Sequence, residues 1–283
     1  MLHPQEGEIF CFDKPYGLTS FRVVSRVRGI LGRLSGNKKL KVGHAGTLDP
    51  LASGVLLVCT GKATKEIDRL QAGTKEYIAT LRLGATTPSF DMETDEDATY
   101  PTAHINRPLI EQVLPRFIGR IEQVPPTFSA VKVDGKRAFK MARKGEEVEL
   151  KAKVLVIDEI ELLDLRLTPG DNLRPRRIDI KTLDEADATG AEAHNASLAP
   201  SLTLRIVCSK GTYIRALARD IGQALGSGAY LQALRRTRIG SYTLDKGTAV
   251  HHIDTFESWA EAQGVAPHVP PITPAHEVAP SDY

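Results

Sequence analysis

Apolar runs and alternating patterns along this chain predict several β-strands. The run Val55–Cys59 is short, β-branched and leucine-rich, and glycines at Gly54 and Gly61 bound it, which predicts a buried strand. From Lys75 to Gly84 apolar and polar residues alternate, which predicts a strand with one buried face. Further strands are expected at Ile9–Phe12, Val154–Leu165, Leu202–Cys208 and Tyr242–Val250, the last closing the sheet.

Helical periodicity marks other segments of the chain. Thr19 or Ser20 offers an N-cap for a first helix, and Ser209–Thr212 offers one for a later helix. The first helix is expected to bury a face made of Phe21, Val24, Val27 and Leu31, and the later one a stripe made of Ile214, Leu217, Ala218 and Ile221. Shorter helices are expected at Lys62–Leu70 and Leu109–Ile118.

The order of these elements predicts the fold class. Strands and helices follow one another at irregular spacing, without the regular strand-helix-strand alternation of a parallel sheet. We therefore expect an α+β fold with a mixed, largely antiparallel sheet and flanking helices.

Polar segments separate the predicted elements. Thr86–Thr99 is acidic and rich in turn residues, which predicts a loop. Residues 123–149 contain Pro125-Pro126 and many cations, which predicts an extended basic arm suited to a polyanion. Residues 166–200 have little periodicity and are interpreted as an inserted loop. From Gly264 the chain is proline-rich and is expected to fray.

Composition narrows the class of protein without identifying it. The chain has 41% hydrophobic and 25% charged residues, as globular proteins do, and a net charge of +2 that by itself indicates no nucleic-acid partner. Cys11, Cys59 and Cys208 lack metal-ligand spacing and are expected to be reduced core residues. No signal peptide or membrane-spanning run is recognisable, so we expect a cytoplasmic protein that does not enter a membrane.

The stretch Lys41–Thr60 presents an aspartate on a loop that enters the core. Asp49 precedes Pro50, which disfavours the helical conformation at the aspartate and holds it extended. A basic cluster lies just before this stretch, and it consists of Arg22, Arg26, Arg28, Arg33, Lys38, Lys39 and Lys41. Taken alone, an aspartate before a proline is more often a turn residue than a catalyst.

Three other site classes fail on spacing. A phosphate loop ending at Gly61-Lys62 needs a glycine at position 56, where Leu56 stands, and Ser or Thr at position 63, where Ala63 stands. No serine lies in a nucleophile elbow. A glycosidase needs two carboxylates flanking the bond, and this stretch supplies one.

A resemblance to a known family is carried by several blocks of sequence. Gly43–Gly54, GHAGTLDPLASG, resembles the signature of the TruB-type bacterial tRNA pseudouridine synthases. Matching blocks follow the family's order along the chain, and they are Asp13-Lys14-Pro15, Lys75-Glu76-Tyr77, Pro125-Pro126, Ser129–Lys132, Ser209–Arg215 and Leu234–Arg236. The resemblance implies the pseudouridine synthase fold and the isomerisation of uridine to pseudouridine at position 55, in the T loop of tRNA.

The resemblance also implies roles for individual residues. Asp49 would be the nucleophile, attacking either the ribose or the uracil, and Arg215 would keep it ionised and aimed. Tyr77 would stack on the target base and take part in removing the C5 proton, and Leu234 would belong to the pocket. His44 would fill the space that the flipped-out nucleotide leaves in the RNA.

Further residues are expected to bind the tRNA T stem-loop. They are Lys14, Lys132, Arg137, Tyr213, Arg235 and Arg236, and the basic arm is expected to contact phosphates. The family chemistry implies no cofactor and no metal, and we expect a monomer. The alternative function is that of a tRNA-binding folding chaperone in which catalysis is secondary.

The expected domain organisation follows from these assignments. Residues 1–250 would form the catalytic domain, including the 123–149 arm and the 166–200 insertion. Residues 251–283 would form a short C-terminal extension in place of the full second RNA-binding domain that many relatives carry.

Overall fold

The computed structural model describes residues 1–129, 131–133, 135–146, 148–167, 199–245 and 248–268. The strands are β1 (Ile9–Lys14), β2 (Val42–His44), β3 (Ala52–Thr60), β4 (Lys75–Leu83), β5 (Ala85–Thr86), β6 (Ala98–Thr99), β7 (Gly119–Gln123), β8 (Lys132–Val133), β9 (Lys136–Arg137), β10 (Lys153–Arg166), β11 (Ser201–Cys208), β12 (Ala229–Ile239), β13 (Tyr242–Thr243) and β14 (Val250–His251). The helices are α1 (Ser20–Ser35), α2 (Ile67–Ala72), α3 (Arg107–Val113), α4 (Ala138–Ala142), α6 (Ile214–Ala224) and α7 (Phe256–Gln263), with short 3-10 helices η1 (Gly61–Glu66) and η2 (Leu114–Phe117).

One large sheet runs through the molecule and organises it. Its strands follow the order β14-β1-β3-β12-β4-β11-β10-β7, with β2 added to β3 and β13 to β12. Neighbouring strands are antiparallel except at β1–β14 and β3–β12, which are parallel. The predicted α+β class with a mixed, largely antiparallel sheet is confirmed.

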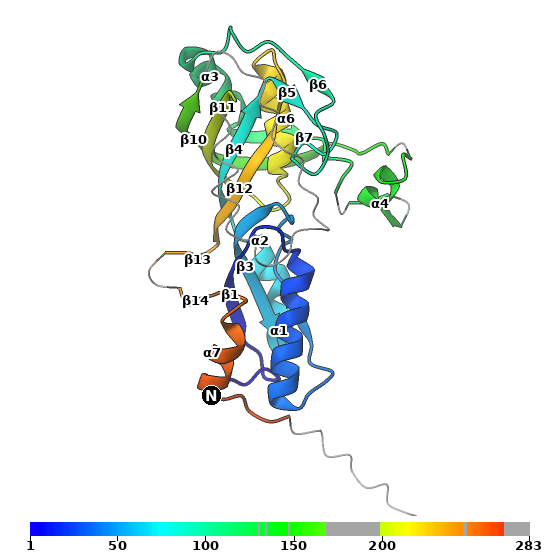
Figure 1. Cartoon of the computed structure of the whole chain (residues 1–283), viewed down its shortest axis with the longest axis vertical. Coiled ribbons are helices and arrows are strands. Elements are labelled where there is room, and N and C mark those ends of the chain that lie inside the picture. The colour runs from blue at the N-terminus through cyan, green and yellow to red at the C-terminus, as the bar shows by residue number, and fades with distance from the viewer. Residues whose placement is uncertain (130, 134, 147, 168–198, 246–247, 269–283) are drawn as a thin grey trace, which may run out of the picture.

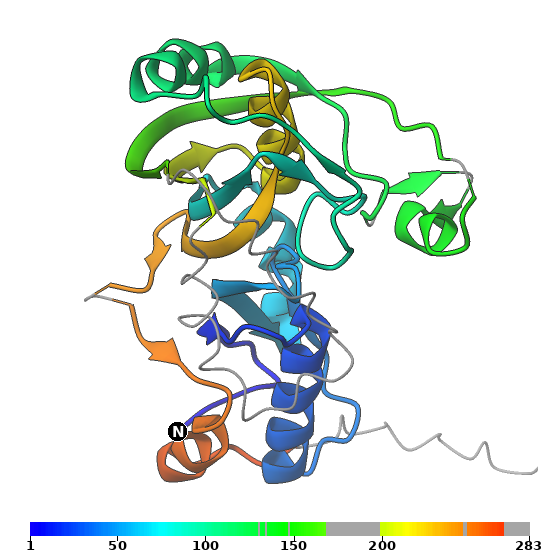
Figure 2. The same cartoon turned by 45° about the horizontal axis from the view of Figure 1, so that its top comes forward.

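The sheet joins two parts of an elongated body. Helices α3 and α6 lie at one end and helices α1 and α7 at the other, while α4 and its hairpin project to the side (Figure 1). The same arm stands away from the body after rotation (Figure 2). The strands β3 and β12 pair where the two parts meet, so residues near that pairing can gather side chains from both.

The strand β3 is buried on both faces, which explains its continuous apolar run. Leu56 and Val58 pack with α1 in one cluster, and Val55 and Leu57 lie in a second cluster with Leu70 of α2. Because alternate residues of a strand point to opposite faces, a strand covered on both sides needs apolar residues at every position.

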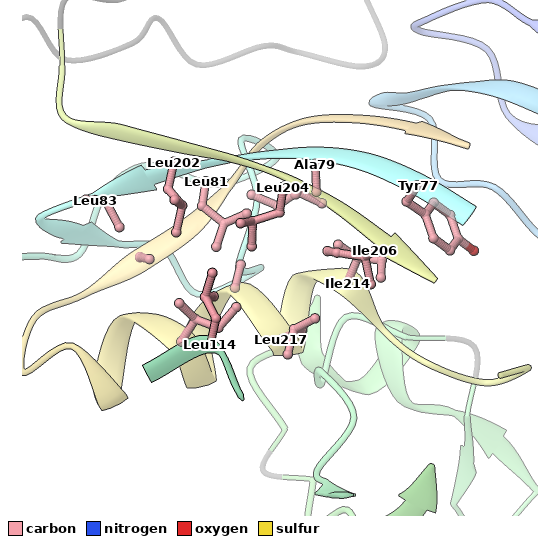
Figure 3. Close-up of a cluster of buried hydrophobic side chains, with 14 of the residues drawn as sticks. Tyr77, Ala79, Leu81, Leu83, Leu114, Leu202, Leu204, Ile206, Ile214 and Leu217 are labelled. Carbon is pink, nitrogen blue, oxygen red and sulfur yellow. The ribbon is translucent and has the colours of Figure 1, made fainter. Parts of the chain in front are cut away.

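The strand β4 buries the alternating face that the sequence predicts. Tyr77, Ala79, Leu81 and Leu83 pack with residues of β11 and of α6 in the largest buried cluster. Figure 3 shows Leu81 and Leu204 on the sheet facing Leu217 on the helical layer below. Tyr77 lies at one end of this row, toward the pairing of β3 and β12.

The helix α1 begins and ends at residues typical of helix caps. The Thr19 side chain accepts from the Arg22 amide at 3.1 Å, and Gly36 follows the last turn in a left-handed conformation. One predicted core residue is wrong, because Phe21 is 67% exposed and Val23 takes its place in the buried stripe.

Two other elements differ from the pattern-based expectations. No strand is predicted at residues 229–238, yet they lie in β12, which pairs with β4 on one side and with β3 on the other. The predicted helices at 62–70 and 109–118 are each divided into a 3-10 and an α-helical part. The predicted strand at 242–250 is present at its two ends, as β13 and β14.

Some predicted segments lie outside the described residues. These are most of the 166–200 insertion, at 168–198, and most of the proline-rich tail, at 269–283. The domain boundary at residue 250 stays a prediction.

Candidate active site

The loop between β2 and β3 carries Asp49 and is fixed on both sides of it. The Ser20 hydroxyl donates to the Leu48 carbonyl at 2.9 Å and accepts from the Leu48 amide at 2.9 Å. The Gly17 amide donates to the Pro50 carbonyl at 2.9 Å, and the Ala52 amide to the Asp49 carbonyl at 3.1 Å. The backbone on either side of Asp49 is therefore held by elements of the first 60 residues.

Lys14 lies beneath this loop and does not face solvent. Its ammonium donates to the carbonyls of Pro15, Leu18 and Pro50 at 2.8, 2.7 and 3.4 Å. Burial lowers the pKa of Lys14 to about 7, and the nearby Asp49 opposes that shift. Because Lys14 is fully buried, we assign it to shaping the loop; the direct RNA contact expected from the sequence finds no accessible ammonium.

Arg215 meets Asp49 from the opposite part of the molecule. It lies in the first turn of α6, and its Nε is 2.9 Å from Asp49 Oδ2. The arginine side chain is 6% exposed, whereas that of Asp49 is 39% exposed. The remaining guanidinium nitrogens donate to the carbonyls of Ser89 and Phe128, each at 3.1 Å. A buried and fully bonded arginine thus holds a carboxylate that is open to solvent.

The start of α6 is itself fixed through Tyr213. The Gln123 side chain, at the end of β7, accepts from the Tyr213 amide at 2.9 Å and donates to its carbonyl at 3.2 Å. These two bonds secure the backbone two residues before Arg215. They also connect the catalytic helix to the point where the basic arm begins.

Asp91 joins the pair as a second carboxylate, which the sequence reasoning missed. Its Oδ2 lies 3.5 Å from Arg215 Nε, and its Oδ1 accepts from the Ser89 hydroxyl at 2.6 Å and the Glu93 amide at 2.9 Å. Burial raises the pKa of Asp91, and Arg215 works in the opposite direction. The residue lies in the acidic 86–99 stretch, where composition predicts no more than a loop.

A small, open pocket lies over these charged groups. Its lining consists of Asp49, Leu51, Ala52, Asp91, Arg215, Leu231, Gln232, Ala233 and Leu234. Leu234 is thus brought beside Asp49 and Arg215, as expected. Tyr77 is buried in the cluster of Figure 3 and is not among the lining residues, although it lies opposite Arg236 across the β4–β12 pairing.

His44 and Tyr77 are uncharged at neutral pH. Burial, together with the nearby Arg236, lowers the pKa of His44. Burial also raises the pKa of Tyr77, and Arg236 counteracts that rise. Both pKa shifts thus favour the neutral form of the ring.

The two arginines that follow Leu234 have different surroundings. Arg235 is 43% exposed, and it donates to Asp13 at 2.7 Å and to the Ser53 hydroxyl at 3.3 Å. Arg236 is 2% exposed; its guanidinium donates to the carbonyls of Val55, Thr47 and Gly46, and it also makes a side-chain hydrogen bond with Tyr77. The phosphate contact expected for Arg236 is therefore not compatible with its position, whereas Arg235 keeps an accessible side.

The basic arm presents exposed cations outside the pocket. Lys132 and Arg137 lie on the β8–β9 hairpin, and both are exposed. The arm also contacts the 86–99 loop that carries Asp91, because Arg143 donates to Glu93 at 2.5 Å. Within the described residues, the arm thus combines an exposed basic surface with a contact to the site.

The basic cluster of α1 is used largely within the molecule. Arg26 pairs with Asp254, Arg33 pairs with Glu257 of α7, and Arg28 donates to the Val42 carbonyl. Arg26 and Arg33 thus connect α1 to the C-terminal segment, and Arg28 connects it to β2. The other cations of this cluster, Arg22, Lys38, Lys39 and Lys41, are exposed.

The part of the chain that the structure describes shows neither a metal-binding cluster nor a membrane-spanning helix. Across the described residues, no group of three or more His, Cys, Asp or Glu side chains is arranged to hold a metal ion. In that same part of the chain no helix is both long and apolar enough to cross a bilayer.

Comparisons with known proteins agree with the geometry. A family model described as the TruB family pseudouridylate synthase N-terminal domain matches residues 33–214, and one described as the tRNA pseudouridylate synthase B C-terminal domain matches residues 215–272. The tRNA pseudouridine synthase B of Phocaeicola vulgatus is 55% identical over 92% of this chain and 96% of its own length.

Solved structures give the same class of fold. In a Cbf5-Nop10-Gar1 complex, one chain is similar with a TM-score of 0.59 and 28% identity, over 92% of this chain and 57% of that one. A chain in an H/ACA RNP bound to a substrate RNA containing 2′-deoxyuridine matches with a TM-score of 0.56 and 27% identity, over 92% and 56%. This protein belongs to the TruB family of pseudouridylate synthases. It is a pseudouridine-forming isomerase, so the predicted family, fold and enzyme class are confirmed.

Proposed function

We propose that this enzyme isomerises the uridine at position 55, in the T loop of tRNA, with Asp49 as the nucleophile. The observation that carries the proposal is a half-exposed Asp49 carboxylate at a pocket, held 2.9 Å from the buried Arg215. An aspartate that serves only in a turn does not need a buried arginine, and Arg215 reaches Asp49 from α6, far away in the sequence. The printed name of its relatives, tRNA pseudouridine synthase B, supports tRNA as the substrate.

The proposed reaction begins when an Asp49 oxygen bonds to the ribose C1′ or to the uracil C6. The bond between N1 and C1′ breaks, the uracil turns within the pocket, and C5 bonds to C1′. N1 gains a proton and C5 loses one, so uridine and product have the same composition. Asp49 is then released. The chemistry requires no redox step, and we expect neither a cofactor nor a metal.

The surrounding residues are assigned by their positions. Leu234 lines the pocket and would contact the base, while Tyr77, whose phenol stays protonated at neutral pH, would stack on it. A protonated phenol is a poor proton acceptor, so stacking is the role that we favour for Tyr77. His44 is the last residue of β2, directly before the Asp49 loop, and its pKa shift favours the neutral ring. It would occupy the space left by the flipped nucleotide.

The RNA would be held by contacts outside the pocket. The exposed Lys132 and Arg137 on the arm and the accessible side of Arg235 are suited to phosphates. Tyr213 lies between the arm and α6 and would contact the RNA near the pocket. We expect a monomer of 30.9 kDa that acts in the cytoplasm.

Asp49→Asn tests the proposal. The variant protein is incubated with unmodified tRNA in EDTA, pseudouridine is mapped along the RNA, and tRNA binding is measured in parallel. We expect binding within about threefold of the parent and a rate at least ~10³-fold lower, since a nucleophile is lost. Asp68→Asn, the same change at an exposed position of α2, should keep the parent rate.

The same assay separates the alternatives. If Asp49→Asn formed pseudouridine at the parent rate, Asp49 would not be the nucleophile. Product at a position outside the T loop would overturn the substrate assignment. If the parent protein bound and refolded tRNA but formed no pseudouridine, the folding-chaperone function would be favoured instead.

A further inference from the structure

Arg236 is a buried arginine that bonds to backbone carbonyls on both sides of Asp49, two in the loop and one in β3, and to the Tyr77 side chain. Its Nε donates to Val55 O at 2.8 Å, Nη1 to Thr47 O at 3.3 Å and Nη2 to Gly46 O at 3.1 Å. Two of these carbonyls precede Asp49 and one follows it. The guanidinium therefore spans the loop from the side of β12, while Ser20 and Lys14 hold it from the side of α1 and β1.

The chemistry at this position requires an arginine. A guanidinium presents five N–H donors in a fixed planar fork, so it can bond three separate carbonyls, whereas a lysine ammonium is a compact charge on a flexible stem. A buried carbonyl that loses its donor costs free energy, so the loop would rearrange to regain bonds. Arg236 thus selects one conformation of the loop.

The backbone packing at Gly54 supports the same conclusion. Gly54 is opposite Arg236 in the parallel β3–β12 pairing, and it has a φ of +107°. A Cβ placed there would lie 2.2 Å from the Arg236 carbonyl oxygen and 2.8 Å from its nitrogen. The two strands approach so closely that Arg236 and the end of the Asp49 loop form one rigid contact.

The strand β12 also carries the pocket. Leu231 to Leu234 line it, and Arg236 itself lies opposite Tyr77 on β4. A single strand thus places the proposed base-contacting residues and, through Arg236, the loop of the nucleophile. The pocket residues and the residue that holds the Asp49 loop are thus only a few positions apart on β12.

We propose that Arg236 is a positioning residue that holds the Asp49 loop in register with the base pocket, and that it makes no contact with RNA phosphate. The inference rests on the proposed role of Asp49. A displaced nucleophile slows the chemical step and leaves RNA affinity unchanged, because the phosphate-binding surface lies elsewhere.

The test uses Arg236→Gln in the full-length chain. Three quantities are measured: the rate of a single turnover at saturating enzyme, the Kd for unmodified tRNA, and the dependence of that Kd on salt. We expect a rate about 100-fold lower, as for a misplacement of about 1 Å. The Kd should change by less than about threefold and its salt slope should stay the same.

Two variants keep the test decisive. Leu31→Ala removes a fully buried side chain of α1 and lowers stability without touching the loop, so it should keep the parent rate at a temperature where both variants are folded. Arg236→Lys keeps the charge but cannot bond three carbonyls, and it should show an intermediate loss of about tenfold. If Arg236→Gln does not fold, a parent rate in Arg236→Lys would overturn the inference.

An unchanged rate with weaker binding and a salt slope reduced by about one would identify Arg236 as a phosphate contact. If Arg236→Gln lost no more rate than an equally destabilised Leu31→Ala, Arg236 would contribute only to the stability of the fold, and the inference would be wrong. Asp49→Asn is measured alongside: if it alone stayed active, the nucleophile assignment would fail while a slow Arg236→Gln would still support positioning of the loop.

Discussion

At the scale of single residues, the site contrasts buried cations with one accessible carboxylate. Lys14, Arg215 and Arg236 are all buried, and each is surrounded by carbonyl or carboxylate oxygens. Buried charges of this kind are costly unless every donor is bonded. Each of the three makes at least one contact with the short loop that carries Asp49, so together they help to define the geometry of the site.

We predict that Asp91→Asn slows the reaction without weakening RNA binding. The amide oxygen can still accept from Ser89 and Glu93, but Arg215 loses the second carboxylate that fixes its orientation. The single-turnover rate should fall by tenfold or more, about 1.4 kcal/mol or more of activation free energy. Asp97→Asn, the same change at an exposed position of the same loop, is the control. Equal rates in the two variants would contradict a role for Asp91.

We predict that Lys14 makes stability depend on pH above neutrality. Its pKa falls from 10.5 in the unfolded chain to about 7 in the folded protein, so between these values the unfolded state binds more protons. Raising the pH from 7 to 9 should therefore stabilise the parent relative to Lys14→Met, by about 1–2 kcal/mol. Urea unfolding of both proteins across this range measures it. A constant difference would show that Lys14 stays fully protonated in the folded state.

At the scale of elements, β12 and the α1–α7 pair decide how the halves are joined. The strand β12 pairs with β4 on one side and with β3 on the other, which brings Leu234 and Arg236 to the Asp49 loop. The helix α7 packs its aromatic residues on β1, and its acidic residues Glu257 and Glu261 pair with Arg33 of α1. The C-terminal segment is thus part of the catalytic body.

We predict that Phe256→Ala strongly destabilises the protein. Phe256 is buried, and its ring centroid lies 5.2 and 4.9 Å from those of Phe10 and Phe12. Loss of this packing should cost about 3–5 kcal/mol in the free energy of unfolding. Phe21→Ala is the matched control, because Phe21 is largely exposed and its loss should change stability by no more than about 0.5 kcal/mol. Denaturant unfolding of both variants provides the comparison.

We predict that the basic arm contributes to affinity and leaves the chemical step unchanged. Replacing Lys132 and Arg137 by glutamine removes two exposed cations. The Kd for tRNA should rise, and its salt slope should decrease by about two, while the rate at saturating enzyme is unchanged. Lys62→Gln, at an exposed position on η1, serves as the control. A lower saturating rate in the double variant would instead place the arm in the catalytic step.

At the scale of the whole molecule, one sheet carries the pocket at Asp49, and a basic arm projects from the body to one side. The pocket lies where strands from the two halves pair, and the arm is connected to it through Phe128 and Arg143. This arrangement is suited to a substrate that is much larger than the nucleotide it presents. Contacts at a distance can position the RNA, while the pocket needs to accommodate only a single flipped base.

The sequence by itself determined the class of fold, the strands with a clear period and the loop that carries Asp49. Local rules suffice for these features: alternation predicts β4, a continuous apolar run predicts β3, and a proline after Asp49 fixes its backbone. Motif order identified the family and placed Arg215 and Leu234 at the site. The side-chain stripe of α1 was predicted only in part, because one Phe points outward.

Only the tertiary structure decided which charged residues stay exposed and which are buried against the Asp49 loop. Arg235 and Arg236 are adjacent in a basic run, yet one stays accessible and the other is buried against Gly46, which is 190 residues away. Asp91 likewise becomes part of the site through Arg215 and not through any local pattern. Side-chain direction and burial depend on contacts between distant segments, so composition and spacing could not assign these roles.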